Sequence, residues 1–117
     1  QLIPDKVDRL FYNIIDRKIP ADIIYEDDEC IAFNDINPQA PFHCLVVPKY
    51  DLRMLSDMNS NNISLIGNLM LQASILGKKY CDNNFRIVIN NGPEACQTVY
   101  HLHVHILGQR KLSWPPG

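Results

Sequence analysis

The sequence lacks the features that mark a membrane, secreted or nucleic-acid-binding protein. Its apolar stretches fall short of the ~20 residues that a membrane helix needs, and residues 1–20 lack the basic and apolar regions of a signal peptide. No run of Lys or Arg forms a basic stripe, and the formal net charge is −2, which argues against nucleic acid or an anionic membrane as a partner. We therefore expect a soluble protein of the cytoplasm, with the nucleus as an alternative location.

The cysteine spacing of a zinc ribbon or a redox dithiol is also missing. Cys30, Cys44, Cys81 and Cys96 are widely spaced, and no C-x-x-C motif occurs. Cys30 and Cys44 lie in strand-like runs and are predicted to be buried, reduced thiols. Cys96 lies in a loop, and its role stays open.

What the chain does have is the size and composition of one folded domain. Its 117 residues, 46% hydrophobic and 21% charged, can build one apolar core but hardly two, so we expect a single domain over residues 1–117. The patterns predict a helix over 5–18, strands over 22–26, 29–35 and 42–47, a helix over 63–80, and strands over 85–90 and 99–107. This order predicts an α+β fold: an antiparallel sheet of about five strands with two helices on one side.

The signals behind the first half of this prediction are specific. In the first helix the apolar residues follow one face, and Asp5 is predicted to be its N-cap. Asp27 and Asp28 separate two strand-like runs and predict a hairpin. The run over residues 42–47 is closed by Pro48 and is typical of a central strand that is covered on both faces.

Histidines gather in the last predicted strand. Strand periodicity puts His101, His103 and His105 on one face, with apolar residues on the other. A solvated strand face would mix residue types, so a purely structural role explains this row poorly. Zinc is the alternative, because histidine is the commonest metal ligand. However, the outer two Cα atoms lie ~13 Å apart in a strand, and both side chains would have to stretch fully to share an ion. We therefore assign no metal and no cofactor to the site.

A neutral imidazole offers a second use of the row. At pH 7 it carries one nitrogen lone pair, which can attack phosphorus without a separate base. His103, in the middle of the row, is the candidate nucleophile. Its other nitrogen must then carry the proton, and a backbone carbonyl of the same segment is the natural acceptor. His105 can donate a proton to the leaving group.

The motif His-φ-His-φ-His-φ-φ, in which φ is apolar, spans His101 to Leu107 and resembles the signature of the histidine triad superfamily. Other segments are similar to its Hint branch, the histidine triad nucleotide-binding proteins: Phe33 to Pro41, Leu45 to Lys49, Gln97 to Tyr100 and Trp114 to Gly117. The resemblance covers nearly the whole chain. It implies a homodimer and hydrolysis of purine nucleoside phosphoramidates, of the AMP or GMP type, through a nucleotidyl-histidine intermediate.

The resemblance also implies roles for single residues. His103 matches the nucleophile, His105 the residue that serves the leaving group, and His101 and His43 the supporting histidines. Thr98 stands where the branch usually has a serine at the leaving group. The residues implied to contact the substrate are Leu10, Phe11, Phe33, Asp35, Ile36, Asn90 on the phosphate side, and Trp114, which is expected to reach the partner subunit.

Some of these residues have simpler interpretations. A Leu-Phe pair on a helix is more often core, a lone His43 in an apolar run is more often buried and satisfied, and an Asn before a glycine is ordinary turn chemistry. Asp35 could accept both hydroxyls of a ribose or could cap the following turn.

The chain also departs from the branch. Cys96 replaces a glycine of the usual Gly-Gln-Ser run, which is expected to stiffen the phosphate loop. Asn34 and Asp51 occupy positions where relatives often carry histidine, so supporting contacts there are expected to differ.

Two other functions remain open. One is hydrolysis of dinucleoside polyphosphates, as in the neighbouring fragile-histidine-triad branch, against which the Trp114 to Gly117 ending argues. The other is a binding module, in which nucleotide occupancy or the dimer surface regulates a protein partner.

Overall fold

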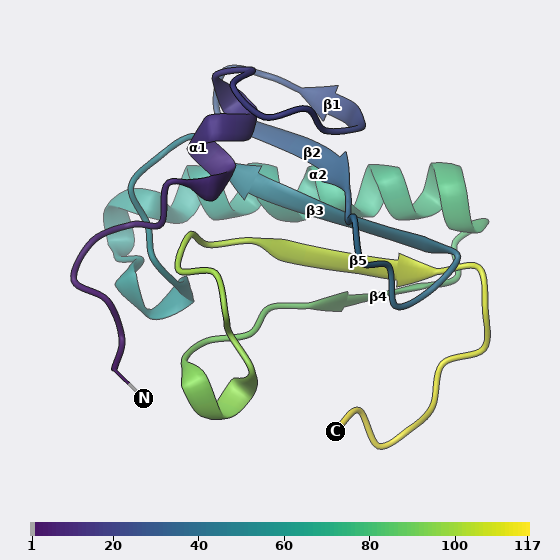
Figure 1. Ribbon diagram of the computed structural model, residues 1–117. Coiled ribbons are helices and arrows are strands. Elements are labelled where there is room, and N and C mark those ends of the chain that lie inside the picture. The colour runs from purple at the N-terminus through teal and green to yellow at the C-terminus, as the bar shows by residue number, and fades with distance from the viewer. Residues whose placement is uncertain (1) are drawn as a thin grey trace.

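A five-stranded antiparallel sheet forms the centre of the structure, a computed structural model that describes residues 2–117 (Figure 1). Its strands are β1 (Ile23–Glu26), β2 (Cys30–Asn34), β3 (Phe42–Pro48), β4 (Phe85–Val88) and β5 (Val104–Gly108). They lie in the order β1-β2-β3-β5-β4, and every neighbouring pair is antiparallel. The predicted α+β fold and strand number are confirmed.

The hairpin and the central strand are also confirmed. The Asp27 carboxylate accepts the backbone N–H groups of Glu29 and Cys30, both at 2.8 Å, and so shapes the turn between β1 and β2. Strand β3 lies in the middle of the sheet, and all seven of its residues are buried. A strand covered on both faces needs apolar residues at every position, which is the pattern that predicted it.

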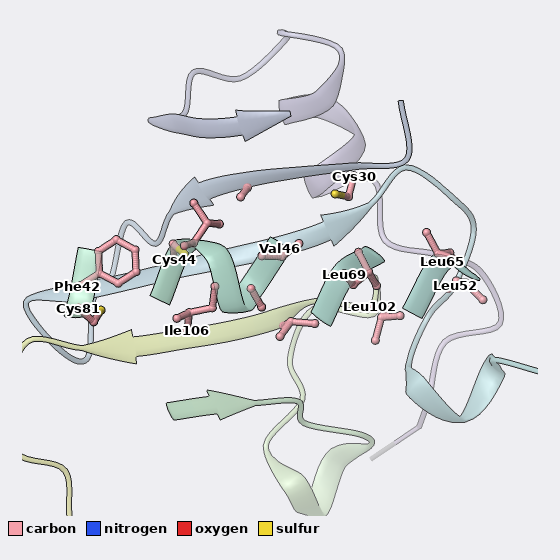
Figure 2. Close-up of a cluster of buried hydrophobic side chains, with 14 residues drawn as sticks. Cys30, Phe42, Cys44, Val46, Leu52, Leu65, Leu69, Cys81, Leu102 and Ile106 are labelled. Carbon is pink, nitrogen blue, oxygen red and sulfur yellow. The ribbon is translucent and has the colours of Figure 1, made fainter. Parts of the chain in front are cut away.

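Helix α2 (Ile63–Cys81) covers one face of the sheet and runs behind it in Figure 1. A short 3-10 turn, η2 (Ser60–Asn62), leads into it, and Asn59 and Asn62 form a capping box there. Figure 2 shows how its side chains meet those of the strands in a buried cluster. The cluster includes Leu65, Leu69, Ala73 and Leu76 from the helix, and Cys44, Val46, Val104 and Ile106 from the sheet.

Helix α1 lies on the opposite face, so the prediction that both helices share one side is wrong. Its residues Phe11 and Ile14 join a second apolar cluster with Ile31, Phe33 and Leu45. Because side chains alternate along a strand, the residues that meet α1 are those that do not meet α2. Helical periodicity shows that a helix has an apolar face, but it does not show which face of a sheet it covers.

The first helix is also shorter than predicted, because α1 spans only Leu10–Ile15. Its N-cap is Arg9 rather than Asp5, and the Asp8 carboxylate accepts the N–H of Leu10 at 3.0 Å. Before it, the N–H of Asp8 bonds the carbonyl of Tyr100, so tertiary contacts hold this segment in an irregular path. Arg17 has a φ of 61°, which ends the helical path before the predicted boundary.

The last strand begins at Val104 instead of residue 99. The backbone of residues 100–102 bonds other segments: the carbonyl of Tyr100 accepts from Asp8, and the N–H of Leu102 donates to Leu52 at 2.7 Å. The carbonyl of His101 is taken by a side chain, as described below. These backbone groups therefore take no part in the hydrogen bonds between β5 and its neighbouring strands.

The remaining described elements are the 3-10 turns η1 (Leu55–Asp57) and η3 (Pro93–Ala95). Within residues 2–117, none of the helices has the length and apolar character needed to cross a bilayer.

Candidate active site

A pocket of about 580 Å³ opens on the α1 face of the sheet. The apolar part of its wall comes from α1, β2, β3 and the segment before β5: Leu10, Phe11, Ile14, Phe33, Leu45 and Val99. Its polar part contains Asp35, His43, Thr98, His103 and His105. One concave site therefore joins a wall suited to a flat ring with a cluster of titratable groups.

The structure brings most of the predicted site residues to this pocket. Nine of them line it: Leu10, Phe11, Phe33, Asp35, Ile36, His43, Thr98, His103 and His105. Ile36 is 96% exposed, so it stands at the rim rather than in the wall. His101, Asn90 and Trp114 are not among the lining residues and are treated separately below.

His103 is held in a single tautomer. Its Nδ1 lies 2.7 Å from the carbonyl oxygen of His101, so Nδ1 carries the proton and donates it. The Nε2 atom is left with its lone pair, and the Phe11 ring packs edge-on at 5.2 Å between centroids. Burial lowers the pKa of His103, with the bond to the His101 carbonyl acting in the opposite direction. The ring is therefore neutral at pH 7 and keeps an oriented lone pair on Nε2, which is what a nucleophilic histidine needs.

A chain of hydrogen bonds orients His105. The N–H of Gln39 donates to Nδ1 of His43 at 3.0 Å, so the proton of a neutral His43 must sit on Nε2. That atom lies 2.9 Å from Nδ1 of His105 and donates to it. His105 is then left with its own proton on Nε2. The chain of bonds from Gln39 through His43 to His105 thus leaves an N–H donor on His105 beside His103, and the centroids of the His103 and His105 rings lie 4.9 Å apart.

The electrostatics keep this cluster uncharged. Burial, followed by the neighbouring His103 and His43, lowers the pKa of His105 to about 4. Burial also lowers the pKa of His43, although the nearby Asp35 carboxylate opposes that change. Three imidazoles can lie close together because none of them is charged at neutral pH.

His101 lies behind the site and is fully buried. Its Nε2 donates to the carbonyl of Pro48 at 2.8 Å, and burial lowers its pKa. Its Nδ1 has no hydrogen-bond partner among residues 2–117. Through its backbone carbonyl, His101 fixes the tautomer of His103, which is a supporting position.

Asp35 caps a turn with one carboxylate oxygen and turns the other toward the pocket. One carboxylate oxygen accepts the N–H of Asn37 at 2.9 Å and caps the turn after β2. The other lies 3.5 Å from Nε2 of His43, and the side chain lines the pocket while 20% exposed. The carboxylate is therefore oriented by the turn and still open to a ligand.

Sequence reasoning missed the role of Gln97, which is 4% exposed. Its side chain accepts the N–H of Gly92 at 2.9 Å and donates to the carbonyls of Arg53 at 2.8 Å and Val99 at 3.1 Å. It thereby anchors the loop that carries Cys96 and Thr98 to the pocket. Cys96 is exposed and has a φ of 66°, in the left-handed region that favours glycine.

Asn90 and Trp114 do not line the pocket in this protomer, although Asn90 lies two residues after Val88, the partner of His105 in the sheet. Asn90 follows the end of β4 and is half-buried. Trp114 is 78% exposed, with the guanidinium of Arg86 at 5.7 Å from its ring centroid. Their predicted contacts with phosphate and with a partner subunit stay predictions.

Asp35, His43 and His105 also form a candidate metal cluster, with ligand atoms that all lie within 4.8 Å of one another. A metal needs bare lone pairs, however, and Nε2 of His43 carries the proton that Gln39 forces onto it. Moving that proton to Nδ1 would set two donors, the imidazole and the Gln39 N–H, against each other. The hydrogen bonding therefore fits a proton relay and does not fit a metal centre.

Comparison with known proteins identifies the family. The HIT domain matches residues 16–112. The chain is 45% identical over 113 residues to a 14 kDa zinc-binding protein of Brassica juncea, with 94% of this chain and 100% of the relative covered. It is 43% identical over 117 residues to the adenylylsulfatase HINT1 of Arabidopsis thaliana, with 97% and 80% covered. A crystal structure of a HIT family hydrolase from Legionella pneumophila is similar with a TM-score of 0.89 at 38% identity, covering 92% of this chain and 98% of that one. The chain therefore belongs to the histidine triad family, in its Hint-like branch.

Proposed function

We propose that this protein is a hydrolase that cleaves purine nucleoside phosphoramidates through a nucleotidyl-histidine intermediate. The observation that carries the proposal is the fixed tautomer pair: His103 keeps a lone pair on Nε2, and His105 keeps a proton on Nε2. A nucleophile and an acid side by side are what displacement of an amine from phosphorus requires.

The reaction follows from these two atoms. Nε2 of His103 attacks phosphorus, the P–N bond breaks with its electron pair going to nitrogen, and His105 gives its Nε2 proton to that nitrogen, which leaves as the amine. The negative charge left on the His105 ring is balanced by the positive charge that the His103 ring gains when its Nε2 bonds phosphorus. Water then attacks the phosphorus of the nucleotidyl-histidine. His105, now lacking that proton, takes one from the water, and the P–N bond to His103 breaks to release the nucleoside monophosphate. Both histidines return to their starting tautomers.

The pocket supports a purine ribonucleotide as the substrate. Phe11 and Phe33 meet edge-on at 5.5 Å between ring centroids and form part of the apolar wall, where a purine ring can be buried. Asp35 lies 3.5 Å from His43 and two residues after Phe33, and both neighbours line the pocket, which supports a role for its carboxylate at the ribose that links base and phosphate. Its free oxygen is the acceptor that we assign to the sugar hydroxyls.

Adenylyl sulfate is a second candidate substrate, because one relative is named an adenylylsulfatase. Its sulfate leaving group is weakly basic and departs without a proton, whereas an amine must be protonated. His105→Asn should therefore reduce kcat/KM for adenosine phosphoramidate by ~10²-fold and for adenylyl sulfate by less than ~5-fold. Intact-mass detection of a nucleotidyl adduct during turnover tests the intermediate directly. Equal losses for both substrates, or no adduct with either, would contradict the proposed roles.

No step of this reaction is assigned to zinc, although two plant relatives are named zinc-binding proteins. The proton on Nε2 of His43 disfavours ligation, so activity should survive exhaustive chelation. Activity that disappears with chelator and returns with zinc would replace the proton relay by a metal mechanism.

A homodimer in the cytoplasm completes the proposal. Helix α2 leaves Ile63, Leu71 and Ile75 between 45% and 68% exposed, a stripe that a second copy would cover. Trp114 is then expected to reach the partner subunit. Three cysteines are buried free thiols, which fits a reducing compartment. Sedimentation as a stable monomer at micromolar concentration would refute the dimer.

A further inference from the structure

Helix α1 forms one wall of the pocket and is held there by tertiary contacts. It is six residues long, and its N-cap Arg9 makes no side-chain cap. So short a helix is unstable by itself and depends on tertiary contacts. Leu10, Phe11 and Ile14 line the pocket, so any change in the position of α1 changes the nucleotide site.

Tyr12 connects this helix to a distant segment. It does not line the pocket, and its hydroxyl donates to the Asp51 carboxylate at 2.5 Å across 39 positions of sequence. Among the described residues, this is the only hydrogen bond that a side chain of α1 makes.

The ring of Tyr12 is held as well. The Arg9 guanidinium lies 4.2 Å from its centroid, and the His101 ring lies 4.8 Å away. Burial, followed by the bond to Asp51, raises the pKa of Tyr12 well above its usual range, so the hydroxyl stays a donor at any physiological pH. The next residue along the chain, Phe11, contacts both His101 and His103.

We propose that Tyr12 and Asp51 form a latch that fixes α1 against the histidine segment and so sets the affinity of the pocket for the nucleoside. The proposal rests on the proposed function for the identity of that ligand. Tyr12 is a positioning residue, because it reaches the substrate only through α1 and Phe11. Opening the latch should therefore weaken binding much more than it slows the chemical step.

The chain supplies a matched control. Tyr25, on β1, donates to the Asp27 carboxylate at 2.7 Å, and its pKa is raised to about 12, first by that bond and then by burial. Its side chain packs on the α2 face, on the other side of the sheet from the pocket. Tyr25→Phe removes the same kind of bond without touching α1.

Two measurements test the latch in Tyr12→Phe. The first is the hydrogen-exchange rate of the backbone amides of Asn13 and Asp16, which donate to the carbonyls of Arg9 and Tyr12. This rate should rise by ~5-fold or more. The second is calorimetric binding of AMP, for which Kd should rise by ~3- to 10-fold while kcat stays within ~2-fold. Tyr25→Phe should alter neither. Asp51→Asn should weaken AMP binding similarly, and the double variant should be no weaker than either single one.

The outcomes separate the latch from the function. Unchanged exchange at Asn13 and Asp16 in Tyr12→Phe overturns the latch, whatever the ligand does. Faster exchange with unchanged AMP affinity overturns its role in binding. Additive losses in the double variant show that the two side chains act independently, which also overturns it. If the wild-type protein binds no purine nucleotide, the proposed function fails, and the exchange measurement still decides whether the latch exists.

Discussion

On β3, Cys44 and Val46 point toward α2, whereas His43 and Leu45 point toward α1. The 19-residue α2 runs along the sheet and closes its face with a continuous apolar core. The six-residue α1 covers only part of the opposite face and leaves a pocket. The length of the covering helix thus decides which face is a core and which is a site. Removing side-chain groups from the α2 face should then lower stability, and removing them from the α1 face should lower activity.

The largest effect on the pocket face is expected from His103→Ala. Removing the nucleophile closes the covalent route, so kcat/KM for adenosine phosphoramidate should fall by at least ~10³-fold. Folding and AMP binding should remain largely intact, as measured by thermal unfolding and calorimetry. Turnover within tenfold of the wild type would show that His103 is not the nucleophile.

The matching change on the α2 face is Leu69→Ala. Leu69 is fully buried in the core cluster, so its truncation should lower the free energy of unfolding by ~2–5 kcal/mol. Below the melting range, kcat/KM should stay close to the wild-type value. Urea unfolding and steady-state kinetics on the same preparation check both, and a large kinetic loss without destabilisation would contradict the division between the faces.

Asp35 tests the sugar end of the pocket. Since a hydrogen bond to a charged group contributes ~1.5–3 kcal/mol, the wild type should prefer adenosine over 2′-deoxyadenosine phosphoramidate by ~10- to 100-fold in kcat/KM. Asp35→Asn should narrow this preference while turnover continues, because the histidines remain. Equal rates for the two sugars in the wild type would remove Asp35 from the site.

The smallest expected effect is on the pH dependence of stability. His105 has a pKa of about 4 in the folded protein and ~6.5 when unfolded. Above pH 6.5 His105 is neutral in both the folded and the unfolded protein, and its contribution to stability is fully present. As the pH falls toward 4, only the unfolded protein takes up the proton, so the folded state loses that stability. The contribution from His105 is on the order of 2 kcal/mol between pH 7 and pH 5. Urea unfolding at a series of pH values should show that the free energy of unfolding falls less steeply with pH in His105→Asn than in the wild type. The same fall in both proteins would contradict the lowered pKa of His105.

Much of this fold could be predicted because its signals are local. The run over residues 42–47 predicted the central strand, and period-2 alternation marked the buried positions of β5. The tautomer of His103 was predictable too, since its acceptor lies two residues away. The start of β5 was not, because residues 100–102 bond distant segments instead of the ladder.

Parts of the site that depend on tertiary contacts could not be predicted from the sequence. The proton relay begins at the backbone N–H of Gln39, a group that every residue except proline has, so side-chain chemistry gives no sign of it. Tyr12 and Asp51 are 39 positions apart, and neither belongs to a motif.

The buried side chain of Gln97 has a consequence for how fast a ligand can enter. Ordering a free loop costs ~1–2 kcal/mol per residue, and here three bonds from Gln97 offset part of that cost when the chain folds. The loop with Cys96 and Thr98 is thus held in place before any ligand arrives. We expect association to be limited by diffusion and entry into the pocket, with no slow rearrangement of this loop.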